Sequence, residues 1–292
     1  MHGEEAENLF RDYLERQGWP YWTESDFRRE LGLSKADPAP DFTILNTSGT
    51  PKALVEVSQF NVHIDFTIEE ELIPIKTSPL YFKFHKKSNQ LRRIWQNLKG
   101  QHGDLPIMLV LYDPQGAQTH FMVILQRILG LTFSMEVNPL QGKIGSRDLI
   151  LTPRGRFLGS ATQHSHLSAV AALHEQEVSA KLSGFDQEIK KIKSTDYKEF
   201  LGEFEKIYNE YRQKGIDVSE TIPVLQIFQN PKAEVEWGHD LWGRFDQVWG
   251  LAERQTYGLI YNGLLLAHAG IIKGVALPDP THSSRSSGFY DE

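Results

Sequence analysis

The sequence predicts an α/β protein with a mixed central β-sheet that is flanked by helices. Three observations lead to this fold class: an amphipathic helix over residues 4–17, a hairpin of short strands over 41–58, and a helix over 80–98 that leads into an apolar strand. Further strands and helices alternate after that strand. Such an order is typical of a sheet covered by helices on both faces.

The first helix is predicted from apolar side chains that repeat at helical spacing on one face, and Gly18 ends it. The side chains of this face are Ala6, Leu9, Phe10, Tyr13 and Leu14. Residues 19–23 then fit a short strand. Residues 25–37 fit a helical turn or loop, and prolines follow directly.

The hairpin consists of the strands Asp41–Leu45 and Lys52–Ser58, joined by a segment rich in Asn, Ser, Gly and Pro. In an antiparallel hairpin, the residue numbers of every cross-strand pair have the same sum. If Leu45 lies opposite Lys52, Asp41 therefore lies opposite Glu56. Thr43 would then lie across from Leu54. Side chains alternate along a strand, so Asp41, Glu56 and Ser58 would point to one face.

The middle of the chain supplies a helix and a buried strand. Ser78 and Pro79 are start signals for the helix over 80–98, and Gly100 marks its end. Residues 106–112 form a continuous apolar run of strand length. Such a run fits a strand that is covered on both faces.

The later segments complete the predicted order. We expect a helix over 121–129, a core strand over 167–173, a charged helical insertion over about 175–218, a last strand over 222–228, a buried or interface helix over 257–277, and a disordered tail from Pro278. At 292 residues, one domain with elaborations is the expected organisation. We therefore expect a domain over 1–250 and a C-terminal helix and tail over 251–292.

Composition and charge limit the function classes. The chain has no cysteine, which excludes disulfides and thiolate metal sites and fits a cytoplasmic protein. No basic region precedes an apolar core at the N-terminus, so we expect no signal peptide, and no segment fits a membrane span. The net charge of −7 argues against coating nucleic acid by charge alone. Between Leu72 and Gly103, however, every formal charge is positive. This segment suits a phosphate-bearing partner, or else forms a solvated helix face.

The carboxylates of Asp41 and Glu56 carry the chemical argument. Two carboxylates directly opposed on adjacent strands repel each other, and this cost is expected where a divalent cation binds both. Oxygen ligands of this kind suit Mg²⁺ or Mn²⁺. The alternative is that one of the two carboxylates faces solvent at a strand end.

These residues resemble the PD-(D/E)XK nucleases over roughly residues 4–112. Pro40-Asp41 matches the Pro-Asp element of that family, Glu56 matches the acidic residue of the next strand, and Glu7 matches a glutamate that many members carry on the first helix. The resemblance implies a restriction endonuclease-like core and a metal held by Glu7, Asp41, Glu56 and the Val57 carbonyl. It also implies that the following helix, where a glutamine such as Gln90 is frequent, helps to frame a DNA groove.

The chain departs from the family at Ser58, which occupies the catalytic position of the motif lysine. That lysine activates the attacking water and stabilises charge on the phosphate, and a serine does neither well. A lysine from the basic helix is one replacement, with Lys86 and Lys83 best placed in the sequence and Lys76 a third candidate. Otherwise the metal supplies most of the catalysis, or the site binds without cutting.

The first functional hypothesis is therefore a metal-dependent DNA endonuclease, of prokaryotic or phage defence or restriction type. Its DNA-binding residues would be Lys83, Lys86, Lys87, Gln90, Arg92 and Arg93. The second hypothesis is a nuclease-fold protein that no longer cuts and serves as a nucleic-acid-binding or assembly module. A third is a scaffold in which the two carboxylates are incidental. A homodimer is compatible with each hypothesis.

Other signals are weaker. His164 and His166 would share a face if they lie on a strand, but no third ligand is visible nearby, so packing is the better interpretation. No glycine-rich phosphate loop and no Gly-x-Ser-x-Gly elbow is present, which leaves kinase, ATPase and serine hydrolase functions without support.

Overall fold

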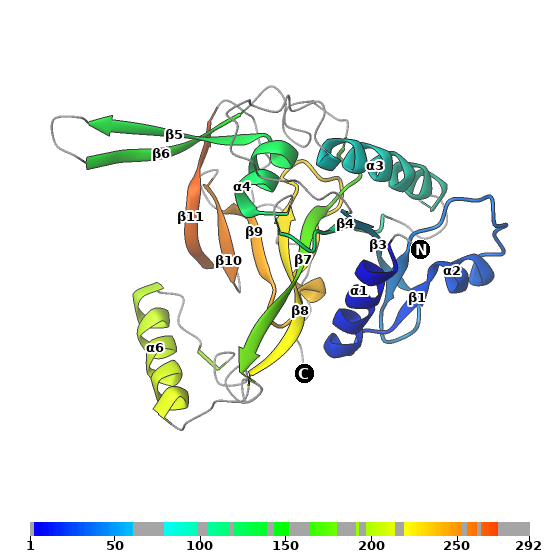
Figure 1. Ribbon diagram of the computed structural model, residues 1–292, viewed down its shortest axis with the longest axis horizontal. Coiled ribbons are helices and arrows are strands. Elements are labelled where there is room, and N and C mark those ends of the chain that lie inside the picture. Colours follow the sequence, from blue (N-terminus) through cyan, green and yellow to red (C-terminus); the bar gives the residue numbers. More distant parts are fainter. Residues whose placement is uncertain are drawn as a thin grey trace.

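The computed structural model of the chain describes residues 3–60, 79–98, 104–116, 119–138, 143–151, 164–179, 191–192, 197–213, 219–252, 256–261 and 264–273. These residues form a mixed β-sheet with helices packed against it (Figure 1). The α/β class predicted from the sequence is therefore confirmed.

The helical elements are α1 (Glu4–Gln17), α2 (Glu24–Glu30), α3 (Pro79–Leu98), α4 (Phe121–Ile124), the π-helical turn η2 (Leu125–Leu129), α6 (Tyr197–Gln213) and the 3₁₀ turn η3 (His239–Leu241). The strands are β1 (Tyr21–Thr23), β2 (Phe42–Leu45), β3 (Pro51–Gln59), β4 (Ile107–Tyr112), β5 (Leu131–Asn138), β6 (Lys143–Leu151), β7 (Ala169–Ser179), β8 (Ser219–Gln229), β9 (Gln247–Ala252), β10 (Thr256–Tyr261) and β11 (Leu264–Lys273).

Within the described part of the chain, eleven strands join in the order β1-β2-β3-β4-β7-β8-β9-β10-β11-β6-β5. The pairs β1-β2 and β2-β3 are antiparallel. The pairs β3-β4 and β4-β7 are parallel. The connection between β3 and β4 contains α3, as a parallel crossover requires a long segment. The central strand β4 is buried at every position, which explains its continuous apolar sequence.

The register of the β2-β3 hairpin is largely the predicted one. Thr43 pairs with Leu54, as expected, and Phe42 pairs with Val55. Continued by one residue, this register places Asp41 across from Glu56. The tip of the hairpin differs, because an irregularity between Ile44 and Leu45 pairs Leu45 with Pro51 instead of Lys52. This difference at the turn does not change the pairing at the other end of the hairpin, where Asp41 and Glu56 lie.

The two faces of β3 contact different layers of the core. Its odd-numbered residues Ala53, Val55 and Val57 pack in the cluster that contains the buried face of α1. Leu54 and Phe60 pack in the other cluster, with the buried face of α3. Since side chains alternate, Glu56 points to the side of the sheet that α3 covers.

The helix α1 forms where its apolar pattern predicts. Ala6, Phe10, Tyr13 and Leu14 are buried, at helical spacing on one face. Gly18 ends the helix in the left-handed conformation at φ 68°, and its N–H bonds to the Glu15 carbonyl. The N–H of Trp19 returns to the Leu14 carbonyl, so the last turn keeps its hydrogen bonds.

The C-terminal part corrects the sequence prediction. Within the described residues, the segment expected as a helix over 257–277 forms two antiparallel strands, β10 and β11. The strand over 222–228 is followed by three more strands, β9 to β11. An apolar run of this length does not distinguish a buried helix from paired strands by periodicity. Residues 175–179 continue β7, and within the described residues the helix of the insertion begins at Tyr197. The predicted tail over 278–292 lies outside the described residues.

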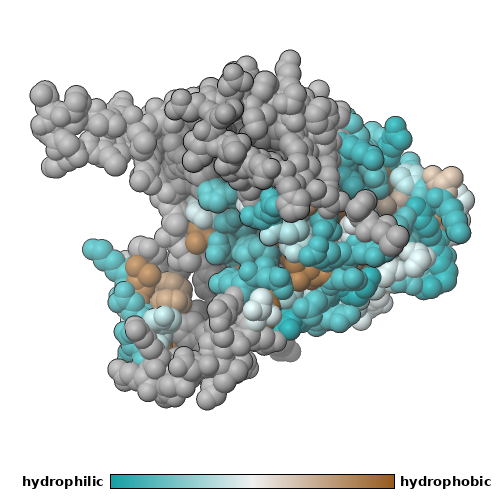
Figure 2. Space-filling model, in the orientation of Figure 1, coloured by the Kyte–Doolittle hydropathy of each residue, from teal (hydrophilic) through white to brown (hydrophobic). Residues whose placement is uncertain are grey.

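The helix α6 lies apart from the sheet in Figure 1, and Figure 2 shows apolar residues on its surface. Its rings Phe200, Phe204 and Tyr208 stack in a row along one side. Of the helices that the structure describes, none is long and apolar enough to cross a membrane.

A buried carboxyl joins the first helix to the later half of the chain. The Tyr13 hydroxyl donates to Asp246 Oδ2 over 2.6 Å, and the N–H groups of Gly243 and Leu225 donate to the same carboxyl. Burial raises the pKa of Asp246 to about 6. The position of α1 on the sheet thus depends on a contact between residues 233 apart in the sequence.

Replacing Tyr13 with Phe is expected to lower the free energy of unfolding by about 1–3 kcal/mol, since it removes one of the three hydrogen-bond donors to the buried Asp246 carboxyl. Denaturant unfolding measures this change. Tyr208→Phe is the control, because this ring is 51% exposed and its hydroxyl should matter by less than about 0.5 kcal/mol. Equal effects of the two variants would contradict the clamp between Tyr13 and Asp246.

Candidate functional site

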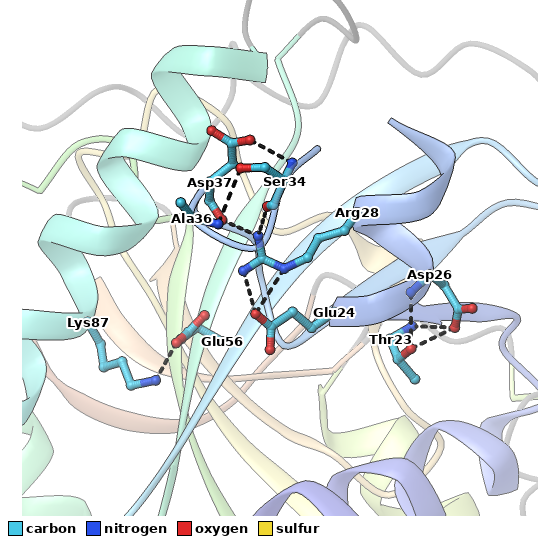
Figure 3. A network of polar contacts seen from close by, with 9 residues as sticks. All are labelled: Thr23, Glu24, Asp26, Arg28, Ser34, Ala36, Asp37, Glu56 and Lys87. Atoms are coloured by element: carbon cyan, nitrogen blue, oxygen red, sulfur yellow. Dashed lines mark hydrogen bonds and ion pairs between the residues drawn. The ribbon is translucent and has the colours of Figure 1, made fainter. Parts of the chain in front are cut away.

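The loop that leads to Asp41 is closed by Arg28 of α2 (Figure 3). The Arg28 guanidinium donates to the carbonyl of Ser34 over 2.7 Å and to the carbonyl of Asp37. It also pairs with Glu24, at 2.6 Å. Asp37 in turn accepts the Ser34 N–H. These contacts fix the chain just before it enters β2, and so they fix the position of Asp41.

Asp41 is held at the mouth of the hairpin by the backbone of β3. Its Oδ2 accepts the N–H of Val57 over 2.7 Å. In the register of the hairpin, Val57 lies across from Pro40, which precedes the first ladder pair of β2 at Phe42. The Asp41 carboxylate satisfies the backbone donor at that point. The contact that joins Val57 to the site is thus its N–H, while the metal-binding role expected for its carbonyl stays a prediction.

Glu56 is fully buried in β3, between β2 and β4. Its Oε1 forms an ion pair with Nζ of Lys87 (Figure 3). Its Oε2 accepts no hydrogen bond from any residue that the structure describes. An ionised carboxylate in this position is costly unless both oxygens have partners. One oxygen of Glu56 is therefore available to a further positive group.

Among the side chains that the structure describes, the lysine at the site is Lys87 of α3, whereas the sequence favours Lys86 and Lys83. Lys86 is exposed and lies on the solvent side of the helix. Lys83 falls on α3, one turn earlier, and Lys76 lies outside the described residues. Lys87 is three residues after Phe84 and four before Leu91, both fully buried. Residues at this spacing share a helix face, so the pattern of apolar residues alone could have selected Lys87.

The pKa values of the site reflect burial first and an excess of negative charge second. Burial, and then the charge of Asp41, raises the pKa of Glu56 to about 8, against the opposing effect of Lys87. Burial also raises the pKa of Asp41, and Lys87 opposes it. Although burial alone would lower it, the pKa of Lys87 is raised by Glu56 and Asp41. One ammonium thus faces more carboxyl groups than it can neutralise, and the site favours an additional cation or a proton.

Glu7 belongs to α1, whose buried face packs on the opposite side of the sheet from α3. Burial raises its pKa, the charge of Asp41 raises it further, and Lys87 lowers it. Glu7 therefore lies within the electric field of the site, although it belongs to another layer. Its role as a ligand stays a prediction.

Ser58 lies two residues beyond Glu56 on the same side of β3 and is buried. It carries no charge, so the ammonium in the described site comes from α3. The predicted DNA-binding residues differ in exposure: Arg93 is exposed, as Lys86 is, while Gln90 and Arg92 are half-buried. The side chain of Lys87 is directed to Glu56, and its role in DNA binding stays a prediction.

Asp41 and Glu56 fit a hard divalent cation. Both offer carboxylate oxygens, and Glu56 Oε2 is buried without a partner among the described residues. In the described ranges, no three histidine, cysteine, aspartate or glutamate side chains form a group that could hold a metal ion. Mg²⁺ is commonly bound by one or two protein carboxylates together with water and substrate phosphates.

Comparison of the chain with known protein families, with curated proteins and with solved structures finds no match. The residues and their geometry therefore carry the functional argument by themselves.

The raised pKa of Glu56 predicts a pH dependence of stability in metal-free protein. A carboxyl whose folded pKa lies above its unfolded value stabilises the fold fully below the unfolded value, about 4.5. This contribution is lost as the pH rises through about 8. We expect the unfolding free energy of the wild type to fall over that range, and Glu56→Gln to remove most of this decline. Denaturant unfolding at intervals from pH 4.5 to 9 measures it, and parallel curves for the two proteins would refute the shift.

Proposed function

We propose that the protein is a metal-dependent phosphodiester hydrolase, and specifically a DNA endonuclease in which Asp41 and Glu56 bind Mg²⁺ or Mn²⁺. The observation that carries this proposal is the buried Glu56, with one oxygen on Lys87 and the other without a described partner, beside Asp41. Buried carboxyl groups with strongly raised pKa values are concentrated at functional sites.

The order of the elements supports the resemblance to PD-(D/E)XK nucleases. A helix with Glu7 is followed by the hairpin that carries Asp41 and Glu56, then by the basic helix α3 and the buried strand β4. Cross-strand pairing gives the two carboxylates a common face independently of the family. A restriction endonuclease-like core is the simplest fold that accounts for both the order of the elements and the common face of the two carboxylates.

Lys87 fits the task of the missing motif lysine. Since the pKa of Lys87 is raised, the side chain stays protonated and acts as a positive charge rather than as a base. From its position at Glu56 it would bind the phosphoryl oxygens that gain charge during hydrolysis. The cation, when bound, supplies Lewis acidity and neutralises the phosphate. Asp41 is fixed on the Val57 N–H and keeps the hairpin and the ligands in register.

The exposed side of α3 suits the DNA backbone. Lys86 and Arg93 are exposed and seven residues apart, so they lie on the same side two turns apart. Contacts of this kind position a duplex without reading its sequence. The basic side of α3 thus compensates locally for the net negative charge of the chain.

A second candidate function is a nuclease-fold module that binds nucleic acid without cutting it. Two observations favour it: Ser58 in the position of the motif lysine, and the engagement of Lys87 with Glu56 in the described structure. In this alternative Lys87 is the permanent partner of the buried Glu56 carboxylate, and no metal cation takes its place.

The test incubates the full-length protein with plasmid and single-stranded DNA in Mg²⁺ or Mn²⁺. Asp41→Ala should abolish cleavage, whereas Asp12→Ala, an exposed acid on α1, should keep the wild-type rate. Binding of DNA without cleavage by the wild type would support the second candidate. If the wild type neither cuts nor binds DNA nor binds a metal ion, both candidates fail.

A further prediction separates the two neighbouring lysines. Lys87→Met should lower the cleavage rate by about 100-fold or more, the typical loss when one stabilising donor is removed from a transition state. Lys86→Ala should leave the turnover rate unchanged and weaken DNA binding, with a smaller effect at higher salt because one phosphate contact is lost. Single-turnover cleavage and a binding titration measure both. Loss of turnover in the Lys86 variant alone would return the catalytic role to Lys86.

A further inference from the structure

A serine interrupts the apolar face of α3. Ser88 is fully buried, between Phe84 and Leu91 on the side of the helix that packs on the sheet. A buried hydroxyl is unfavourable without hydrogen bonds, and an alanine would fill the position at lower cost. Ser88 follows Lys87 directly, so whatever fixes Ser88 also fixes the origin of the Lys87 side chain.

Two buried histidines bind Ser88. Its hydroxyl lies 2.7 Å from Nδ1 of His164 and 3.3 Å from Nε2 of His166, and its carbonyl lies 2.9 Å from Nε2 of His166. A carbonyl only accepts, so Nε2 of His166 carries the proton and donates. Burial lowers the pKa of His166 to about 4, and its ring is therefore neutral at physiological pH. The Ser88 hydroxyl is then free to donate to His164.

The segment that carries the histidines is itself anchored in the core. The Asn230 amide donates to the carbonyls of His164 and Leu167 over 3.1 and 2.8 Å. The hydroxyl of Ser168 accepts the N–H of Ile107 at the start of β4. The ring of Phe84 packs edge-on against His164 at 5.0 Å. These contacts attach α3 to β4 and to the end of β8.

Helix geometry makes such an attachment specific. Successive residues of an α-helix differ by 1.5 Å in height and about 100° in direction. Hydrogen bonds to Ser88 tolerate only a few tenths of an ångström. Apolar packing alone would tolerate a small rotation or slide of α3, whereas these bonds do not. The same rotation would move Nζ of Lys87 away from Glu56.

We propose that Ser88, held by His164 and His166, is a positioning residue that sets the rotation of α3 and so delivers Lys87 to Glu56. The catalytic importance of this placement rests on the proposed function, whereas the placement itself does not. Ser88 has no access to substrate, because it is buried in the core.

The test measures the position of Lys87 without any cleavage. Full-length, metal-free protein is treated with a limiting acetylating reagent, and mass spectrometry gives the acetylation of Lys87 relative to Lys86. In the wild type the ion-paired Lys87 should react more slowly. Ser88→Ala should raise the ratio of Lys87 to Lys86 by about tenfold, the factor that the loss of one or two hydrogen bonds produces in an equilibrium constant.

The matched control is Tyr257→Phe, which also removes one buried hydroxyl, here bonded to the carbonyls of Gln229 and Trp249. It should leave the acetylation ratio unchanged. If Ser88→Ala does not fold, a pair of variants at His166 replaces it. His166→Phe removes the donor and should raise the ratio, while His166→Gln keeps a donor near Nε2 and should restore it.

An unchanged ratio in folded Ser88→Ala, or in His166→Phe, would overturn the proposal. So would an equal rise in Tyr257→Phe, which would indicate general destabilisation. A raised ratio in a protein that cuts no DNA would leave the positioning role intact and refute the nuclease. In a protein that cuts DNA, Ser88→Ala should lower kcat and leave KM nearly unchanged, because Lys86 and Arg93 keep their exposed positions.

Discussion

The contact on which the site depends is the buried ion pair between Glu56 and Lys87. A carboxylate in the middle of a sheet is tolerated only when its charge has a partner, and removal of one partner of a buried pair commonly costs about 3–5 kcal/mol. Here the pairing is incomplete, because Asp41 adds a second negative charge and Glu56 Oε2 has no described partner. Burial, and then the charge of Asp41, raises the pKa of Glu56, and the incomplete pairing supports the proposal that a divalent cation binds here.

The surroundings of the pair explain how it is held in place. Arg28 closes the loop before Asp41, the Val57 N–H fixes the Asp41 carboxylate, and Ser88 fixes the helix that carries Lys87. These supports come from separate parts of the chain, and the sheet joins them. The hydrogen bond between Tyr13 and Asp246 holds α1, and with it Glu7, in place on the same sheet.

The sequence predicted the N-terminal part of the fold and the pairing of the carboxylates, because a period of two and a short turn determine a hairpin face. It did not select Lys87, although the spacing of Lys87 from the apolar Phe84 and Leu91 places all three on the helix face that packs on the sheet. His164 and His166 looked like metal ligands or packing residues, and their common partner Ser88 is 76 and 78 residues away. The sequence predicts a helix where the C-terminal strands lie, because the sheet and not local periodicity sets their pairing partners.

The central claim is that Asp41 and Glu56 bind a divalent cation which the charge of the site requires. Titration of metal-free protein with Mn²⁺, followed by electron paramagnetic resonance of the free ion, measures this directly in the absence of DNA. The account predicts that the wild type binds Mn²⁺ and that Glu56→Gln loses this binding while remaining folded. Equal Mn²⁺ binding by the two proteins, or no binding by the wild type, would contradict it.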